Sequence, residues 1–297
     1  MQYETINAIR MPTRLPMGYH WIASYLSAFF LSALPLAASK LTPYAQIEAL
    51  EIRECSGIAQ SRQFKDVYWT HNDSGTGSKL YAMRSSGTLI AALETGLPNI
   101  DWEDITIDDS GALYIADSGN FENTRRDLVI HRISEPNPFR VHDALEIKSY
   151  PFAYPDQKAF PPKKRQFDCE ALFWSQRKLY LLTKSLGDTS TRLYRFDTLQ
   201  EDRINVPEFV ASFDIGPRVT GAEASPDGSR LAILTTRSVW VFDKPDASDN
   251  VFEGPALMRP IQAGQCEAIC WESASTLLIA NEGRELFRVS VDSLLEY

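Results

Sequence analysis

The sequence lacks several features that mark well-known classes of protein. Its 297 residues include four cysteines, and no two of them have the Cys-x-x-Cys spacing of a zinc knuckle or a redox motif. There is no Gly-x-Ser-x-Gly elbow, no His-Glu-x-x-His pair and no glycine-rich phosphate loop before a helix. No stretch is rich in Lys or Arg, and the net charge is −9. A nucleic-acid polymer is therefore not expected as a partner, whereas an acidic surface suits cations.

Long apolar runs are also missing, except at the N-terminus. Residues 15–39 contain no charged side chain, Arg10 and Arg14 precede this run, and small residues end it at positions 37–39. A basic flank, a short apolar core and small residues predict a secretory signal peptide over residues 1–39. An uncleaved membrane anchor is the alternative. The remainder, residues 40–297, is expected to be a single domain that is periplasmic or secreted, without stable membrane insertion and monomeric.

Residues 40–297 contain a repeat in five copies. Each copy opens with one of five short segments, at positions 54–58, 101–105, 168–172, 219–222 and 265–269. Further apolar strands follow each opening segment, separated by turn residues, and no amphipathic helix interrupts them. Short strands in groups of four, repeated at the spacing of these five opening segments, are typical of a β-propeller. We therefore predict an all-β fold, a five-bladed β-propeller. A six-bladed ring and a β-sandwich are the alternatives.

The last copy has no room for a fourth strand before Tyr297. Residues 47–52, just before the first copy, read as an unassigned strand that can supply it. This N-terminal strand would close the ring and leave no unpaired edge at the seam.

The first strand of every blade lines the channel of a propeller, so equivalent positions on the five strands lie at one level. Three carboxylates and two hydroxyls are expected at this level, which we call the pore ring: Ser56, Glu103, Glu170, Thr220 and Glu267. Close like charges either take up protons or hold a cation. Oxygen ligands without His or thiolate predict Ca²⁺ as the bound cofactor. The alternative is that these Glu residues line a wet channel and accept hydrogen bonds from backbone amides. If the fourth copy were slipped in register, Glu223 would join the ring in place of Thr220.

The cyclic order hydroxyl–Glu–Glu–hydroxyl–Glu resembles that of the calcium-activated nucleotidases, or apyrases. The resemblance implies a five-bladed propeller with a Ca²⁺ ion in its pore. At the substrate face only Asp73 and Gly75 resemble the acidic turn of that family. The strings Trp-Thr-His-Asn-Asp-Ser-Gly at 69–75 and Asp-Trp-Glu-Asp at 101–104 are more similar to a group of bacterial exported propeller proteins without a known activity.

The second strand of each blade ends on the face where the first strand begins, so its last residues should surround the channel mouth. Loops on one face of a rigid scaffold commonly carry function. Turn formation and neutralisation of nearby acids are the alternative roles for these residues. Nine positions form this expected ligand rim: His71, Asp73, Asp101, Asp104, Asp117, Asn120, Lys184, Arg237 and Glu282.

Two functions fit these residues. The first is an exported, Ca²⁺-containing propeller that binds a small-molecule or other polar ligand on its rim. The alternative is a Ca²⁺-dependent phosphohydrolase of the nucleotidase type, in which Lys184 and Arg237 hold phosphate. No residue is assigned as catalytic. The four cysteines are expected to be free thiols, and Cys55 with Cys266 is the one pair considered for a disulfide.

Overall fold

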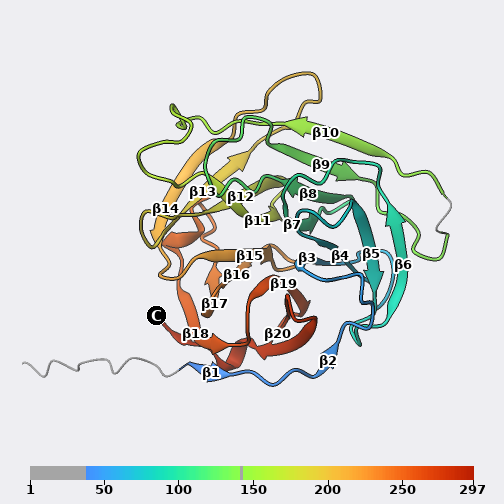
Figure 1. Ribbon diagram of the computed structural model, residues 1–297. Helices are drawn as coiled ribbons and strands as arrows, with labels where there is room; N and C mark the ends of the chain where they lie inside the picture. Colours follow the sequence, from blue (N-terminus) through green and yellow to red (C-terminus); the bar gives the residue numbers. More distant parts are fainter. Residues whose placement is uncertain (1–37, 141–142) are drawn as a thin grey trace, which may run out of the picture. The chain divides into compact units, whose positions relative to one another are not determined.

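Hydrogen-bonded strands form five sheets in the computed structural model, which describes residues 38–140 and 143–297. The sheets are arranged around a common centre as the blades of a β-propeller, with β3, β7, β11, β15 and β19 innermost (Figure 1). The five-bladed fold is therefore confirmed, and the six-bladed and sandwich alternatives are wrong. Residues 1–37, with nearly all of the expected signal peptide, lie outside the described residues.

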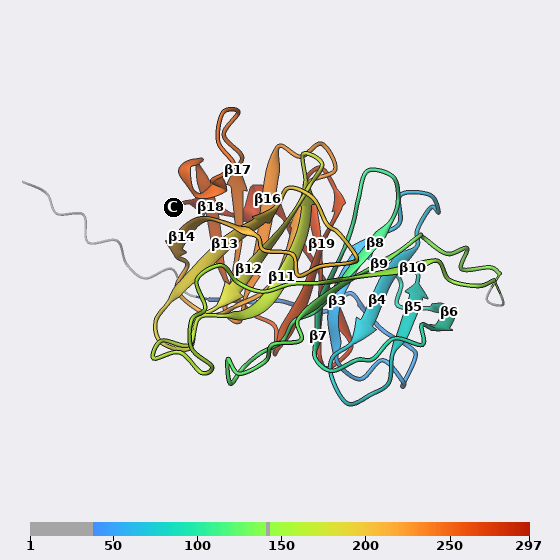
Figure 2. The same cartoon turned by 90° about the horizontal axis from the view of Figure 1, so that it is seen from above.

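In each blade four antiparallel strands lie side by side from the channel outwards, and in blades 1 to 4 these four strands follow one another along the chain (Figure 2). Blade 1 contains β3 (Cys55–Gln60), β4 (Tyr68–Asn72), β5 (Lys79–Met83) and β6 (Leu89–Glu94). Blade 2 contains β7 (Trp102–Ile107), β8 (Leu113–Asp117), β9 (Val129–Ile133) and β10 (Ile147–Pro151). Blade 3 contains β11 (Asp168–Ser175), β12 (Lys178–Lys184), β13 (Ser190–Phe196) and β14 (Glu208–Asp214).

Blades 4 and 5 hold the two ends of the described chain. Blade 4 contains β15 (Val219–Ala224), β16 (Arg230–Thr235), β17 (Ser238–Asp243) and β18 (Ala256–Gln262), and both β1 (Ser39–Lys40) and β22 (Leu295–Glu296) pair with β18. Blade 5 contains β19 (Cys266–Ser273), β20 (Thr276–Asn281), β21 (Glu285–Ser290) and β2 (Ala45–Gln46). Two single-turn 3₁₀ helices occur at Val251–Glu253 and Val291–Ser293. None of the helical segments in the described ranges could span a bilayer.

The N-terminal segment closes the ring, but with other residues than expected. The closing strand is β2, in which Ala45 pairs with Leu286. Residues 47–52 are not a strand, because the Glu48 N–H donates to the Gly87 carbonyl and the Ile52 N–H donates to the Ala49 carbonyl. Ile47 and Ile52 are buried between blades 5 and 1 instead. The apolar residues of this segment therefore serve packing, while the shorter Ala-Gln pair supplies the sheet edge.

The hydrophobic core lies between the blades. Each of five clusters of buried apolar side chains joins two neighbouring blades. Trp69, Trp102 and Trp271 are fully buried in these clusters. All four cysteines are buried free thiols, as expected. Because the apolar side chains point between sheets, the edges of the inner strands are left to line the channel with polar groups.

Candidate functional site

A β-bulge occurs at the same place in each of the five inner strands. In blade 1, Cys55 pairs with Asn72 and Gly57 with His71, so Ser56 is the extra residue. The same irregularity falls at Glu170, Thr220 and Glu267, and at the Glu103-Asp104 step of β7. A bulge turns a side chain out of the normal alternation of a strand. The fold therefore presents the five expected pore-ring residues at equivalent positions, and the unslipped register of Thr220 is correct.

The two hydroxyl groups of the pore ring hold neighbouring blades together. Ser56 Oγ donates to the Glu103 carbonyl at 2.8 Å, and Thr220 Oγ1 donates to the Cys266 carbonyl at 2.8 Å. Each hydroxyl oxygen can still offer a lone pair to a cation, but its proton is donated to a backbone carbonyl. The carboxylates are thus the principal cation-binding groups of this level.

Carboxylates gather on one side of the pore ring in two groups that share Glu103. In each group one oxygen per residue lies within 4.8 Å of the others: Asp73, Asp101 and Glu103 in the first group, and Glu103, Asp168 and Glu170 in the second. At this separation two like charges repel by roughly 3–4 kcal/mol at an effective dielectric constant of about 20. Positive charge or protons must therefore accompany the groups.

The second group already has an internal cation. Lys184 Nζ lies 2.5 Å from Glu170 Oε1 and 3.8 Å from Asp168 Oδ2. Both carboxylates are about 2% exposed or less, whereas the Lys184 side chain is 19% exposed. No hydrogen bond reaches the buried Asp168 Oδ2 atom. Lys184 therefore neutralises Glu170 directly and leaves Asp168 only partly compensated.

The protonation of these acids reflects their burial. Burial, then the neighbouring Glu170 and Asp168 charges, raise the pKa of Glu103 well above its usual range. Burial and then Asp73 raise the pKa of Asp101 to about 6. Burial also raises the pKa of Glu267 to about 7, which the Gln265 contact and Lys184 partly oppose. For Lys184, burial alone would lower the pKa, but the adjacent carboxylates raise it. The site thus binds protons that a cation could replace.

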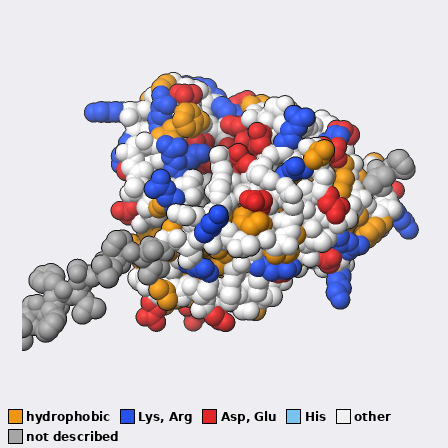
Figure 3. Space-filling view, turned by 60° about the horizontal axis from the view of Figure 1, so that its bottom comes forward, with side chains coloured by type: hydrophobic (Ala, Val, Ile, Leu, Met, Phe, Trp, Pro, Cys, Tyr) orange, Lys and Arg blue, Asp and Glu red, His pale blue; other side chains and the backbone are white. Residues whose placement is uncertain are grey.

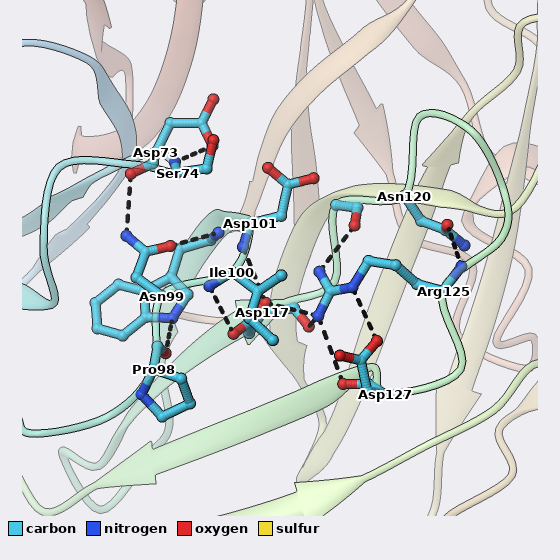
Figure 4. Close-up of polar contacts among 12 residues, drawn as sticks. Asp73, Ser74, Pro98, Asn99, Ile100, Asp101, Asp117, Asn120, Arg125 and Asp127 are labelled. Atoms are coloured by element: carbon cyan, nitrogen blue, oxygen red, sulfur yellow. Dashed lines mark hydrogen bonds and ion pairs between the residues drawn. The ribbon is translucent and has the colours of Figure 1, made fainter.

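Hydrogen bonds position two members of the first group, Asp73 and Asp101 (Figure 4): Asp73 Oδ1 accepts the Ser74 N–H at 2.5 Å. Asp117 accepts the Ile100 and Asp101 N–H groups and pairs with Arg125 at 2.9 Å. This network fixes the backbone of Asp101, whose carboxylate carries no dashed contact in Figure 4. A Cβ at Gly119 would overlap Glu103 Oε1 and Asp101 Oδ2. Only a glycine there leaves both carboxylates in place.

A second set of acids fills the channel below the mouth and supports the blades. Asp104, which is 1% exposed, accepts the N–H groups of Leu172 at 2.9 Å and Ala222 at 3.4 Å. Glu223 accepts the Trp271 N–H at 2.7 Å. Asp104 is therefore not a rim residue as expected. It ties blades 3 and 4 to blade 2, because its position in the bulge turns it to the backbone of those blades.

The other expected rim residues divide into two kinds. His71 is fully buried with its ring edge-on to Trp102, and Asn120 is buried with its N–H donating to Asp168 Oδ1 at 2.5 Å. With Asp117 they support the site from behind. His71 Nδ1 lies 3.0 Å from the Asn72 carbonyl, whereas no hydrogen bond from the described residues reaches its buried Nε2. Asp73, Asp101, Lys184, Arg237 and Glu282 are at least partly accessible at the mouth.

Two mouth residues were missing from the expected set. Asp168 belongs to the second carboxylate group, and Arg218 lies near enough to lower the pKa of Asp168 against the effect of its burial. Both precede their pore-ring residue by two positions, as does Asp101. Side chains two apart lie on the same face of a strand. In the five copies, the residue two positions before the pore ring is Glu54, Asp101, Asp168, Arg218 or Gln265. This row of polar residues in the sequence was the signal for a second ring of side chains at the mouth.

Comparisons with known proteins show no family for this chain. No family model matches the chain, and no curated protein matches it. A gluconolactonase of Xanthomonas campestris is 12% identical, with 89% of this chain and 96% of that chain covered and a TM-score of 0.46. A structural-genomics target, provisionally assigned as a gluconolactonase, is 15% identical over 81% of this chain and 74% of that one, with a TM-score of 0.44. Similarity of this degree transfers no activity to this chain.

The surface of the described unit shows the contrast of charges on which the site depends. Figure 3 presents one face, on which acidic side chains gather in a patch with Lys and Arg side chains around it. In the described residues, the channel mouth combines five partly or fully buried carboxylates with Lys184: Asp101, Glu103, Asp168, Glu170 and Glu267. Such an arrangement can bind a divalent cation or exchange protons.

Proposed function

We propose that the protein is a propeller module that binds a hard divalent cation, Ca²⁺, at its channel mouth and a small polar ligand beside it. The observation that carries this proposal is the grouping of Asp73, Asp101 and Glu103, whose oxygens lie within 4.8 Å of one another without an ion pair of their own among the described residues. Carboxylate oxygens in a partly accessible site are the ligands that Ca²⁺ prefers.

The first carboxylate group suits such an ion better than the centre of the pore ring does. The Lys184 ammonium already lies against Glu170, so a cation next to that residue would meet like charge. Asp73, Asp101 and Glu103 are partly exposed, which gives an ion a route from solvent. We therefore infer that the ion lies on the blade 1–blade 2 side of the mouth, with Glu103 as its pore-ring ligand and Asp73 and Asp101 completing the acidic set.

When bound, Ca²⁺ would supply a positive centre to which an oxygen of a small ligand could coordinate. Export and a monomeric state remain predictions of the proposal. The nucleotidase-like alternative is not carried forward, because Lys184, one of the two cations expected to hold phosphate, is paired with Glu170.

Titration calorimetry of the full chain with Ca²⁺ tests the proposal. We expect about one ion per chain, and binding should raise the melting temperature by mass action. Glu103→Gln should weaken Ca²⁺ binding at least about tenfold, because this residue belongs to both carboxylate groups. Glu296→Gln, an exposed residue of β22, is the matched control and should bind as the parent does. An EDTA-treated chain that neither binds Ca²⁺ nor changes its melting temperature would exclude the proposal.

A further inference from the structure

A cleft of about 700 Å³ lies on the mouth face between blades 3 and 4. It is formed by the β12–β13 connection, the β14–β15 connection and the β16–β17 turn. Its lining includes Asp188, Arg218, Thr236 and Arg237. The cleft lies outside the cation site, yet Arg218 is near enough to influence Asp168 at the mouth.

Two arginines of this cleft have no carboxylate partner among the described residues. In the described residues, the ion pairs formed by arginine involve arginines other than Arg218 and Arg237. Both Arg218 and Arg237 are exposed. The one acidic lining residue, Asp188, is already compensated by Lys164 Nζ at 2.6 Å. The net charge left in the cleft is therefore positive, next to a strongly acidic mouth.

The backbone fixes the two arginines as neighbours. The Thr236 N–H donates to the Arg218 carbonyl at 3.0 Å, and the Arg237 N–H donates to Thr235 Oγ1 at 3.2 Å. In addition, the Arg237 carbonyl accepts the Ile261 N–H of β18 at 2.8 Å. The Arg218 carbonyl is thus bonded to the residue that precedes Arg237, and backbone hydrogen bonds hold both arginines at neighbouring positions of the cleft.

We propose that Arg218 and Arg237 form an anion subsite that binds an oxyanion group, phosphate or carboxylate, of a small ligand. Guanidinium groups donate paired hydrogen bonds to such groups, and unpaired arginines are suited to this recognition. The anion subsite stands on the cleft alone. A second claim does rest on the proposed function. It is that the ligand bound there is a small oxyanion whose remaining oxygens face the cation.

The test follows the arginine Nε–H signals of the full chain by NMR, in EDTA and at constant ionic strength, during titration with inorganic phosphate and separately with malonate. We expect saturable shifts for Arg218 and Arg237. Arg218→Gln and Arg237→Gln should each weaken binding by about tenfold, which corresponds to about 1.4 kcal/mol. Arg140→Gln, an exposed arginine of the β9–β10 connection, is the matched control and should leave binding unchanged.

The outcomes separate this inference from the proposed function. Shifts that do not saturate, or substitutions with no more effect than Arg140→Gln, would overturn the anion subsite. The anion subsite would also be overturned if the anion bound only in the presence of Ca²⁺ and neither arginine substitution weakened its binding. The anion would then be coordinated by the cation. Saturable binding in a chain that fails to bind Ca²⁺ would support the subsite and reject the proposed function. The stronger of the two probes identifies the oxyanion class.

Discussion

The ammonium group of Lys184 lies 2.5 Å from Glu170 Oε1, at a site where Glu103 and Asp168 are also close. This pair determines which part of the mouth can take up a further cation. It neutralises Glu170 of blade 3 directly and Asp168 in part, and it leaves Asp73, Asp101 and Glu103 without an ion pair among the described residues. The asymmetry is a property of the folded chain, since Lys184 comes from the end of β12 and Glu170 from the bulge of β11.

Replacement of Lys184 should therefore have opposite effects on folding and on cation binding. Lys184→Met leaves Glu170 buried without its partner, and we expect a loss of about 3 kcal/mol in the free energy of unfolding at pH 8 in EDTA. The same change removes a competing positive charge, so Ca²⁺ should bind roughly tenfold more tightly, about 1.4 kcal/mol. Urea unfolding and calorimetry measure the two effects. Lys148→Met, which breaks an exposed pair with Glu201, is the control and should change both little.

The pH dependence of cation binding follows from the raised pKa values of the acids. Asp101, whose pKa is raised to about 6, and Glu103, whose pKa is raised well above its usual range, hold protons that Ca²⁺ must displace. Ca²⁺ affinity should therefore rise from pH 5 to pH 8, with proton release. Calorimetry in buffers of different ionisation enthalpy measures that release. An affinity that stays flat over this range would disagree with a site made of these carboxylates.

The same shifts predict the reverse trend for the stability of the cation-free chain. An acid whose pKa is higher in the folded than in the unfolded state stabilises the fold below its unfolded pKa, near 4. That contribution is lost as the pH rises through the folded pKa values of about 6 for Asp101 and about 7 for Glu267. In EDTA, stability should fall from pH 5 to pH 8, and saturating Ca²⁺ should remove the fall.

A substitution at Gly119 alters the cation site without replacing one of its proposed ligands. In Gly119→Ala the new Cβ would displace the ends of Glu103 and Asp101, which are flexible side chains, so the chain should still fold. We expect Ca²⁺ affinity to fall by about tenfold, equal to about 1.4 kcal/mol. Gly77→Ala is the opposite case: the new Cβ meets no atom within 4 Å, and its cost comes from the backbone conformation at φ +90°, a cost that Gly119→Ala does not carry. It should lower the melting temperature and leave Ca²⁺ affinity as it was.

Asp104 should matter for stability and not for the mouth. In Asp104→Asn an amide donor would face the backbone N–H groups that the carboxylate accepts, from Ile105, Leu172 and Ala222. We expect a loss of about 2 kcal/mol in the free energy of unfolding. Asp109→Asn, in the exposed β7–β8 turn, should cost less than about 0.5 kcal/mol. If the two variants unfold at the same denaturant concentration, Asp104 does not join the blades as described.

The repeat and the pore ring could be predicted from the sequence because both depend on local pattern. Equivalent positions in five copies reveal the strand that lines the channel, and Glu103 and Glu170 stand out there. The different surroundings of Glu103 and Asp104 could not be predicted, because a bulge breaks the alternation on which the prediction depends. The strand that closes the ring was misplaced for another reason. Ile47 and Ile52 are apolar because they pack in the core, and their spacing among polar residues resembles the pattern of a half-buried strand.

The most direct test of the account is the position of a cation in crystals of the full chain grown with Ca²⁺, located by anomalous scattering. We expect one strong peak about 2.3–2.6 Å from oxygens of Asp101 and Glu103, on the side away from Lys184. The same peak should be lost in Glu103→Gln crystals and kept in Glu296→Gln crystals. A channel mouth without a peak, in crystals that hold Ca²⁺ at well-ordered sites elsewhere, would contradict the central claim.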